Sequence, residues 1–148
     1  MSNSNHQFSF YQTYEGLLYK TICQLVEKSY QSSLKITILV PNVEVQEELN
    51  KILWTYTRKY FIPHGSQLDP YPEKQPIYIT DRLENPNNAS VLMIIAPTEM
   101  QVILADTQYI ENFQRIITVY EVLENLPTIT NSSVDYYMQN PTGGWAKR

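Results

Sequence analysis

The stretch that decides the fold is Leu34-Lys35-Ile36-Thr37-Ile38-Leu39-Val40, which is followed directly by Pro41-Asn42. It is rich in β-branched residues and apolar on both faces, which is typical of a parallel strand covered on both sides. Proline ends such a strand, and Asn42 is a preferred residue at a helix N-cap. Glu44 follows in the first turn, where the helix dipole favours an anion. The stretch therefore predicts a buried strand that leads straight into a helix.

The rest of the chain repeats this alternation of strands and helices. Residues 8–11 suit a short strand, and Thr13 can cap a helix that runs from residue 14 to about residue 30. The other expected features are an apolar stripe of Val45, Leu49, Ile52 and Leu53 on the second helix, a short peripheral strand over 77–80, a turn over 85–88, a buried strand over 91–96, a helical turn over 109–113 and a last strand over 116–120. This order predicts a Rossmann-like three-layer α/β fold, with five or so mostly parallel strands and helices on both faces of the sheet.

Prolines shape the connections. Four prolines between residues 55 and 76 make a regular helix or a central strand unfavourable there, so we expect this stretch to be mostly irregular. Pro127 interrupts any long helix after the last strand. We therefore expect only a short closing helix that begins at Asn131 or Ser132 and ends near Gln139.

Length and composition bound the organisation of the chain. Its 148 residues are enough for one ordinary domain, and no linker is long enough to divide them. We expect a single domain over 1–148, with a flexible N-terminus over 1–6 and a C-terminal tail over 141–148. No apolar run approaches the roughly 20 residues that a membrane-spanning helix needs, and no signal segment is visible. One cysteine, Cys23, can form neither an intramolecular disulfide nor a zinc cluster, so we expect a reducing compartment, the cytoplasm.

Residues that carry chemistry are sparse. Glycine occurs only at positions 16, 65, 143 and 144, so the chain lacks both glycine-rich phosphate-binding motifs. Neither His6 nor His64 has a ligand partner at metal-site spacing, and Cys23 reads as a small core thiol. We therefore expect no catalytic residue, cofactor or metal. One alternative is a nucleotide-binding or small-molecule enzyme, with its pocket at the strand ends near Pro41 or Pro97.

The net charge of the chain bears on a third class of function, direct binding of nucleic acid. Eleven basic against fifteen acidic residues give a net charge of −4, whereas domains that bind DNA phosphates are usually basic. Stacking of single-stranded DNA on the many tyrosines remains an open alternative, which a steep dependence of DNA affinity on salt would favour.

One aromatic segment stands out. Trp54, Tyr56, Tyr60, Phe61 and His64 fall within eleven positions, at the end of the second helix and in the loop after it. Two interpretations stay open. The aromatic side chains complete the core under a long connection, or they form an exposed anchor for a protein partner, because tryptophan and tyrosine dominate binding hot spots.

The same segment resembles a known family. Leu53-Trp54, six intervening residues and Phe61-Ile62-Pro63-His64 are similar to the L-W-x6-F-[VI]-P-H segment of the chi subunit of bacterial DNA polymerase III holoenzyme. The neighbouring strands and helices agree in pattern over roughly residues 8–121. The resemblance implies a non-catalytic replication subunit with a nucleotide-free Rossmann-like fold. Such a subunit links the clamp loader, through the small psi subunit, to single-stranded-DNA-binding protein, and meets DNA only indirectly.

The resemblance also implies site residues. Trp54 and Phe61 match aromatic contacts to psi, and Pro63 and His64 shape that loop. In the family, a basic C-terminal helix meets the acidic C-terminal tail of single-stranded-DNA-binding protein, but residues 122–144 here contain no lysine or arginine. The nearest cations are Arg115, Lys147 and Arg148. Three alternatives stay open for this chain: the acidic tail binds elsewhere on the protein, it binds more weakly, or this role has been lost.

Overall fold

The structure is a computed structural model that describes residues 7–14, 16–56, 62–66, 69–95, 100–121, 133–140, 142 and 144–147. Its strands are β1 (Gln7–Gln12), β2 (Ile36–Leu39), β3 (Gly65–Ser66), β4 (Ile77–Thr80), β5 (Val91–Ile95), β6 (Arg115–Tyr120), β7 (Ser133–Gln139) and β8 (Trp145–Lys147). Its helices are α1 (Leu18–Gln31), α2 (Val43–Thr55), α3 (Met100–Ala105) and α4 (Thr107–Ile110), with a 3₁₀ turn over Pro72–Lys74. None of the helices in these ranges is long and apolar enough to cross a membrane.

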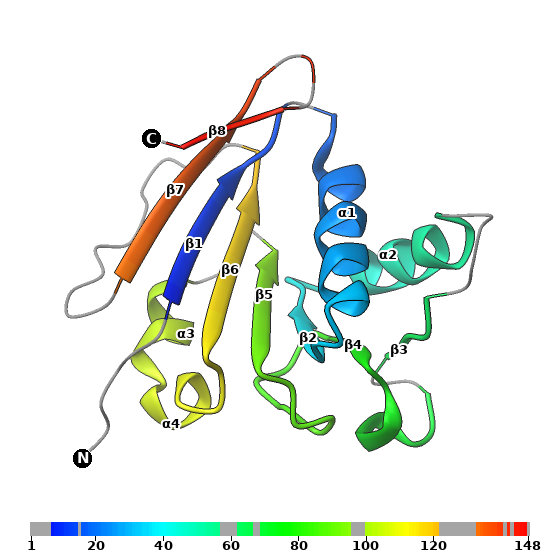
Figure 1. The fold of residues 1–148 in the computed structure, drawn as a ribbon. Coiled ribbons are helices and arrows are strands. Elements are labelled where there is room, and N and C mark those ends of the chain that lie inside the picture. The colour runs from blue at the N-terminus through cyan, green and yellow to red at the C-terminus, as the bar shows by residue number, and fades with distance from the viewer. Residues whose placement is uncertain are drawn as a thin grey trace.

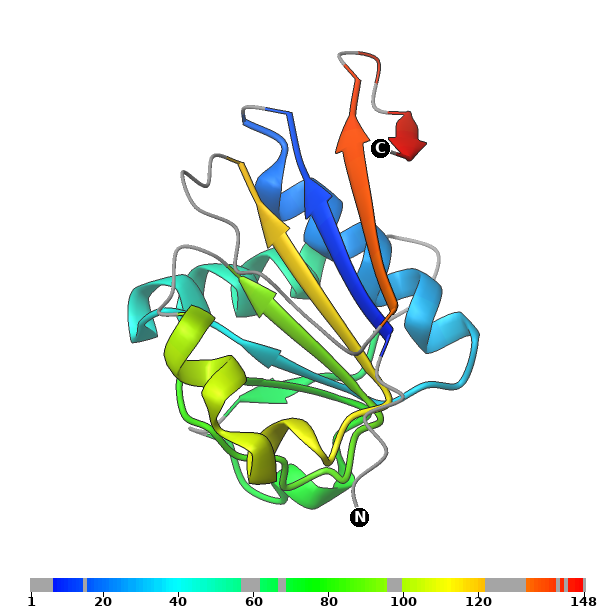
Figure 2. The ribbon, with the colours of Figure 1, turned by 90° about the vertical axis from the view of Figure 1, so that its left-hand side faces the viewer.

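The described strands form one sheet of eight strands in the order β3-β4-β2-β5-β6-β1-β7-β8. Neighbouring strands pair in parallel, apart from β7 and β8, which are antiparallel. Helices α1 and α2 lie on one face of the sheet, and α3 and α4 lie on the other (Figures 1 and 2). The predicted α/β fold with helices on both faces is therefore confirmed.

The central strand behaves as its sequence predicts. All four residues of β2 are buried, because β2 lies between β4 and β5 and has a helical layer on each side. Alternate residues divide between two cores, so that Ile38 packs under α1 and α2 while Leu39 packs against α3 and α4. The Asn42 side chain accepts a hydrogen bond of 2.9 Å from the Val45 N–H and caps α2 as predicted.

Helix α1 begins later than predicted. It starts at Leu18 rather than residue 14, and its N-cap, Leu17, makes no side-chain capping bond. Thr13 does not cap a helix. Its N–H and its hydroxyl both donate to the carbonyl oxygen of Tyr120, at 2.7 and 3.4 Å, so Thr13 extends the contact between β1 and β6. Gly16 then turns the chain with a φ of +83°, a conformation that glycine adopts freely.

The prediction for the C-terminal part is wrong. Ser133–Gln139 forms strand β7, not a helix, and β7 pairs in parallel with β1. Two cross-strand pairs stack in this contact, Phe10 on Tyr136 at 5.2 Å and Tyr11 on Tyr137 at 4.7 Å between ring centroids. Strand β7 pairs along an edge of β1 that would otherwise leave backbone groups unpaired, and this long-range pairing overrides the local helical pattern. Pro127 and the expected helix start lie outside the described residues.

The sheet is also wider than predicted at its two ends. Trp145–Lys147, expected within a tail, forms β8 against β7. The β4 strand, expected to be peripheral, has all four residues buried and carries the two-residue β3 on its outer side. The expected flexible segment over residues 1–6 lies outside the described ranges.

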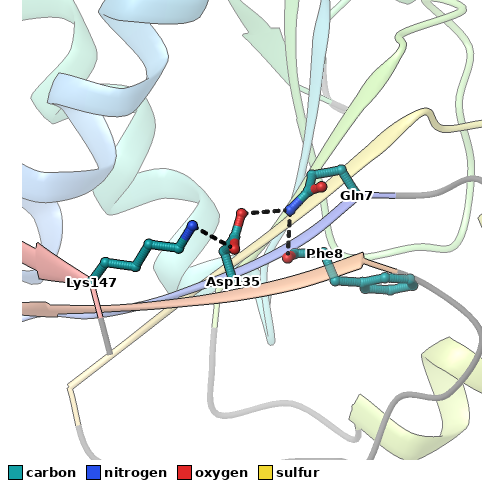
Figure 3. A network of polar contacts seen from close by, with 4 residues as sticks. All are labelled: Gln7, Phe8, Asp135 and Lys147. Carbon is teal, nitrogen blue, oxygen red and sulfur yellow. Dashed lines mark hydrogen bonds and ion pairs between the residues drawn. The ribbon is translucent and has the colours of Figure 1, made fainter.

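A polar contact joins the two ends of the chain (Figure 3). The Asp135 carboxylate on β7 forms an ion pair of 3.0 Å with Lys147 on β8. It also accepts a hydrogen bond of 2.9 Å from the Gln7 side chain on β1. Strands β1, β7 and β8 are thereby connected by side chains as well as by backbone pairing.

The predicted turn over residues 85–88 is held by a buried hydrogen-bond network. The Asn87 amide donates to the carbonyl oxygens of Ile36 and Gln75, at 3.1 and 3.0 Å. The Thr37 hydroxyl, on the central strand, lies 2.8 Å from the Asn87 amide oxygen. Asn87 is only 1% exposed, so it connects the turn to the middle of the sheet where water cannot replace its bonds.

We expect Asn87→Ala to lower the free energy of unfolding by about 2–4 kcal/mol, because it leaves several buried polar groups without partners. Urea unfolding followed by circular dichroism measures the change. Asn50→Ala, a substitution of a half-exposed asparagine on α2, is the control and should change the free energy by no more than about 0.5 kcal/mol. Equal urea-unfolding midpoints for Asn87→Ala and Asn50→Ala would contradict the role given to Asn87.

Candidate protein-binding site at Trp54

Trp54 is an exposed tryptophan at the end of a rigid helix. On α2 the residues that face the core are Gln46, Leu49 and Leu53, which recur at helical spacing. Trp54 is rotated away from them by one residue, about 100° around the helix. Its exposure is 58%, against 2% for Leu53. The interpretation that Trp54 completes the core is therefore wrong, and the side chain is presented to the surroundings.

His64 supports the Trp54 ring from the side. The two rings meet edge to face, with 5.3 Å between centroids and 67° between planes. The His64 ring is itself fixed, because its Nδ1 lies 2.8 Å from the carbonyl oxygen of Ile62 and therefore carries the proton in this contact. Ile62 is buried, so the support is anchored in the core.

The structure brings together Trp54 and His64, two of the four residues predicted for this site, and places Pro63 beside His64 in the same loop, half-buried. Phe61, the fourth, lies outside the described residues. We call Trp54, Pro63 and His64 the Trp54 surface.

The second predicted set, the cations for an acidic tail, is spread out. Arg115 begins β6, and Lys147 ends β8; both are exposed. Strands β1 and β7 separate them, which corresponds to about 14 Å across the sheet at the usual strand spacing. They are also offset along the strands, because Arg115 is level with Gln7 and Lys147 with Tyr11. The ion pair and hydrogen bond with Asp135 raise the pKa of Lys147, so its charge is retained. Arg148 lies outside the described ranges.

Aromatic side chains that the sequence reasoning missed lie beside Lys147 in the sheet. Tyr11 stacks on Tyr137, and Trp145 meets Tyr11 edge to face with 5.1 Å between centroids. Burial and then Tyr137 raise the pKa of Tyr11, whereas the positive charge of Arg115 acts in the opposite direction. We call Tyr11, Tyr137 and Trp145 the aromatic shelf. The local signal for it is the presence of Val134, Tyr136 and Tyr137, residue types that favour a strand.

The one cysteine, Cys23, lies where it is unreactive. Cys23 is fully buried in the core under α1, which confirms its interpretation as a core thiol. Burial, and then Glu27, raises the pKa of Cys23 to about 12, so the thiol stays protonated and is a poor nucleophile. The described residues hold no group of three or more His, Cys, Asp or Glu that could bind a metal. Pro97, near which a nucleotide pocket was the alternative, lies outside them.

If Trp54 serves a partner and not the core, its removal should hardly affect folding. We expect Trp54→Ala to change the free energy of unfolding by less than about 1 kcal/mol, as exposed substitutions do. Leu53→Ala, the neighbouring and buried position, should cost about 2–5 kcal/mol. Thermal and urea unfolding of both variants compares them directly, and a comparable loss for Trp54→Ala would show that the ring supports the fold.

The fold and this surface define a Rossmann-like α/β protein in which the turn after β2 carries a helix cap in place of a glycine-rich loop, and in which a tryptophan is left exposed. Residues 6–133 match the family model described as DNA polymerase III chi subunit, HolC. The chain is 51% identical over 150 residues to the "Probable DNA polymerase III subunit chi" of Rickettsia prowazekii (strain Madrid E), an alignment that covers 95% of this chain and 91% of that protein. The chain belongs to the family of DNA polymerase III chi subunits.

Proposed function

We propose that this chi-family subunit is a non-catalytic adaptor of the DNA polymerase III holoenzyme, connecting the clamp loader to single-stranded-DNA-binding protein. Family membership supports its place in the polymerase complex. The observation that carries the adaptor role is Trp54, which is 58% exposed although it is a large aromatic residue. Since the proposed partners work on the bacterial chromosome, the subunit would act in the cytoplasm and meet DNA through its partners.

The Trp54 surface suits a small protein partner, psi or an equivalent clamp-loader protein. Large aromatic side chains contribute most where they enter a pocket and exclude water. Trp54 is held by the helix on one side and by the fixed His64 ring on the other, so little conformational entropy is lost when a partner covers it. Phe61 is proposed as the second aromatic anchor and Pro63 as a residue that shapes the loop.

We expect Trp54→Ala to weaken binding to the clamp-loader partner about 30-fold or more, which corresponds to about 2 kcal/mol. Phe61→Ala combined with it should weaken binding further. Tyr71→Ala, which removes a 61% exposed aromatic residue from a different loop, is the matched control and should bind normally. Isothermal titration with the purified psi or equivalent clamp-loader protein measures the affinities. Unchanged binding by the Trp54→Ala, Phe61→Ala double variant would refute the site.

A second contact, with the acidic tail of single-stranded-DNA-binding protein, is proposed at the aromatic shelf. Half-buried aromatic rings can receive the apolar end of a peptide, and cations beside them can receive its carboxylates. Lys147 is level with Tyr137 and Tyr11 in the sheet, and Arg115 begins β6, four residues further along the strands. Lys147 is, however, already paired with Asp135. Asp135 would therefore compete with the tail, and we expect the affinity to be modest and to fall with added salt.

This competition makes a specific prediction. Asp135→Asn should tighten binding of the tail peptide several-fold, because it releases Lys147 and removes a like charge, whereas Arg115→Ala and Lys147→Ala should each weaken it. Fluorescence anisotropy with a labelled C-terminal peptide of the cognate single-stranded-DNA-binding protein measures all three variants. A peptide lacking its terminal apolar residue is the control. Identical affinities for the three variants would place the tail elsewhere on the protein, and no binding at all would indicate that this role is absent.

A further inference from the structure

The exposed side of α2 continues from the Trp54 surface to the other end of the helix. Val43, Glu47 and Trp54 follow one another at intervals of four and seven residues, so their side chains lie within about 40° of one another around the helix axis. All three are exposed, and the two apolar residues, Val43 and Trp54, are 37% and 58% exposed. They are the first residue of the helix and the last but one, about 16 Å apart along its axis. The exposed side of α2 is therefore a line with an apolar side chain at each end.

Glutamates lie between these two apolar ends. Glu47 is on the line itself, and Glu44 and Glu48 are exposed beside it. The three carboxylates form no ion pair with the part of the chain that the structure describes. Lys51, the one cation of α2, is a single turn away from Glu47 and Glu48 and pairs with neither. We call the residues of this side the α2 outer face: Val43, Glu44, Glu47, Glu48 and Trp54.

Folding alone does not account for the charge of this face. The helix dipole favours an anion in the first turn, which explains Glu44, but its effect falls off before Glu47 and Glu48. Glu44 and Glu48 are also four residues apart, and like charges at this spacing destabilise a helix. Unpaired carboxylates beside an exposed tryptophan are instead suited to a partner that brings positive charge.

We propose that the α2 outer face binds a positively charged segment of the clamp-loader partner, which lies along the helix and carries its cations between two apolar residues. One apolar residue packs on Trp54 and the other on Val43, while lysine or arginine side chains between them meet Glu47 and its neighbours. This inference rests on the proposed function, because it names the chemistry of the partner that covers Trp54. The same negative charge repels an acidic tail, so it keeps the two proposed contacts apart on the protein.

A charge reversal tests the middle of the line. We expect Glu47→Lys to weaken binding about tenfold at low salt, because it sets like charges against one another, and the loss should shrink as salt is added. Isothermal titration with the purified psi or equivalent clamp-loader protein, at low and at high salt, measures the affinities. Glu111→Lys makes the same change of charge at an exposed position that ends α4, on the other face of the sheet, and should bind normally (Figure 2). Equal affinities for the two variants at low salt would overturn the proposal.

The far end of the line needs a variant of its own. We expect Val43→Ser to weaken binding about threefold at every salt concentration, because it removes apolar contact area and no charge. Leu34→Ser is the matched control, since Leu34 is also 37% exposed but lies in the loop before β2, and it should bind normally. Thermal melting of each variant checks that it is folded. Normal binding by Val43→Ser would show that the partner does not extend along α2, and this result too would overturn the proposal.

The variants at Trp54 separate this inference from the proposed function. If Trp54→Ala weakens binding while Glu47→Lys does not, the partner uses the Trp54 surface and the charge complementarity along α2 is wrong. If the Trp54→Ala, Phe61→Ala double variant and Glu47→Lys all bind normally, the proposed function of the site fails together with the inference.

Discussion

The pairing of β1 on both of its edges is the interaction that attaches the last strands of the chain to the sheet. β1 lies between β6 and β7, so residues 7–12 are hydrogen-bonded to residues far away in the chain on each side. Without β1, β7 would have no parallel partner and β8 nothing to extend. The ion pair of Lys147 with Asp135 and the bond from Gln7 reinforce the same junction. The aromatic shelf exists only because this pairing brings Tyr11, Tyr137 and Trp145 together.

Helix α2 is fixed in the core by one set of side chains and leaves a tryptophan exposed. Leu49 and Leu53 are buried and fix the helix to the sheet, so the backbone at Trp54 is fixed while its side chain stays outside the core. His64 comes from the loop beyond the helix, yet its ring lies against Trp54 because Ile62 is anchored in the same core. A side chain that is exposed and also rigid is suited to a binding surface, since its ordering cost has been met by folding.

Two polar side chains in the connection between β4 and β5 bond to groups of the sheet. Asn87 binds the central strand and a neighbouring loop, and Glu84 accepts bonds from two hydroxyls of β4. Both residues belong to the segment between β4 and β5, so this segment is bonded to both β4 and β2. Their side chains give polar groups hydrogen-bond partners, as backbone pairing does within the sheet.

The sequence by itself determined the parallel core and the family. Strand β2, the Asn42 cap, β5 and β6 were predictable because their signals are local: β-branched runs, a cap residue and a proline stop. The start of α1, strands β7 and β8 and the aromatic shelf were not predicted, because pairing with distant strands decides them. The strand-forming residues in 133–139 favour a strand but do not say which strand it joins. For the site, the sequence indicated Trp54 and His64 together, but both core and surface positions were compatible with it. Only the rotation of α2 against the sheet, fixed by which side chains fill the core, decided that Trp54 faces outward.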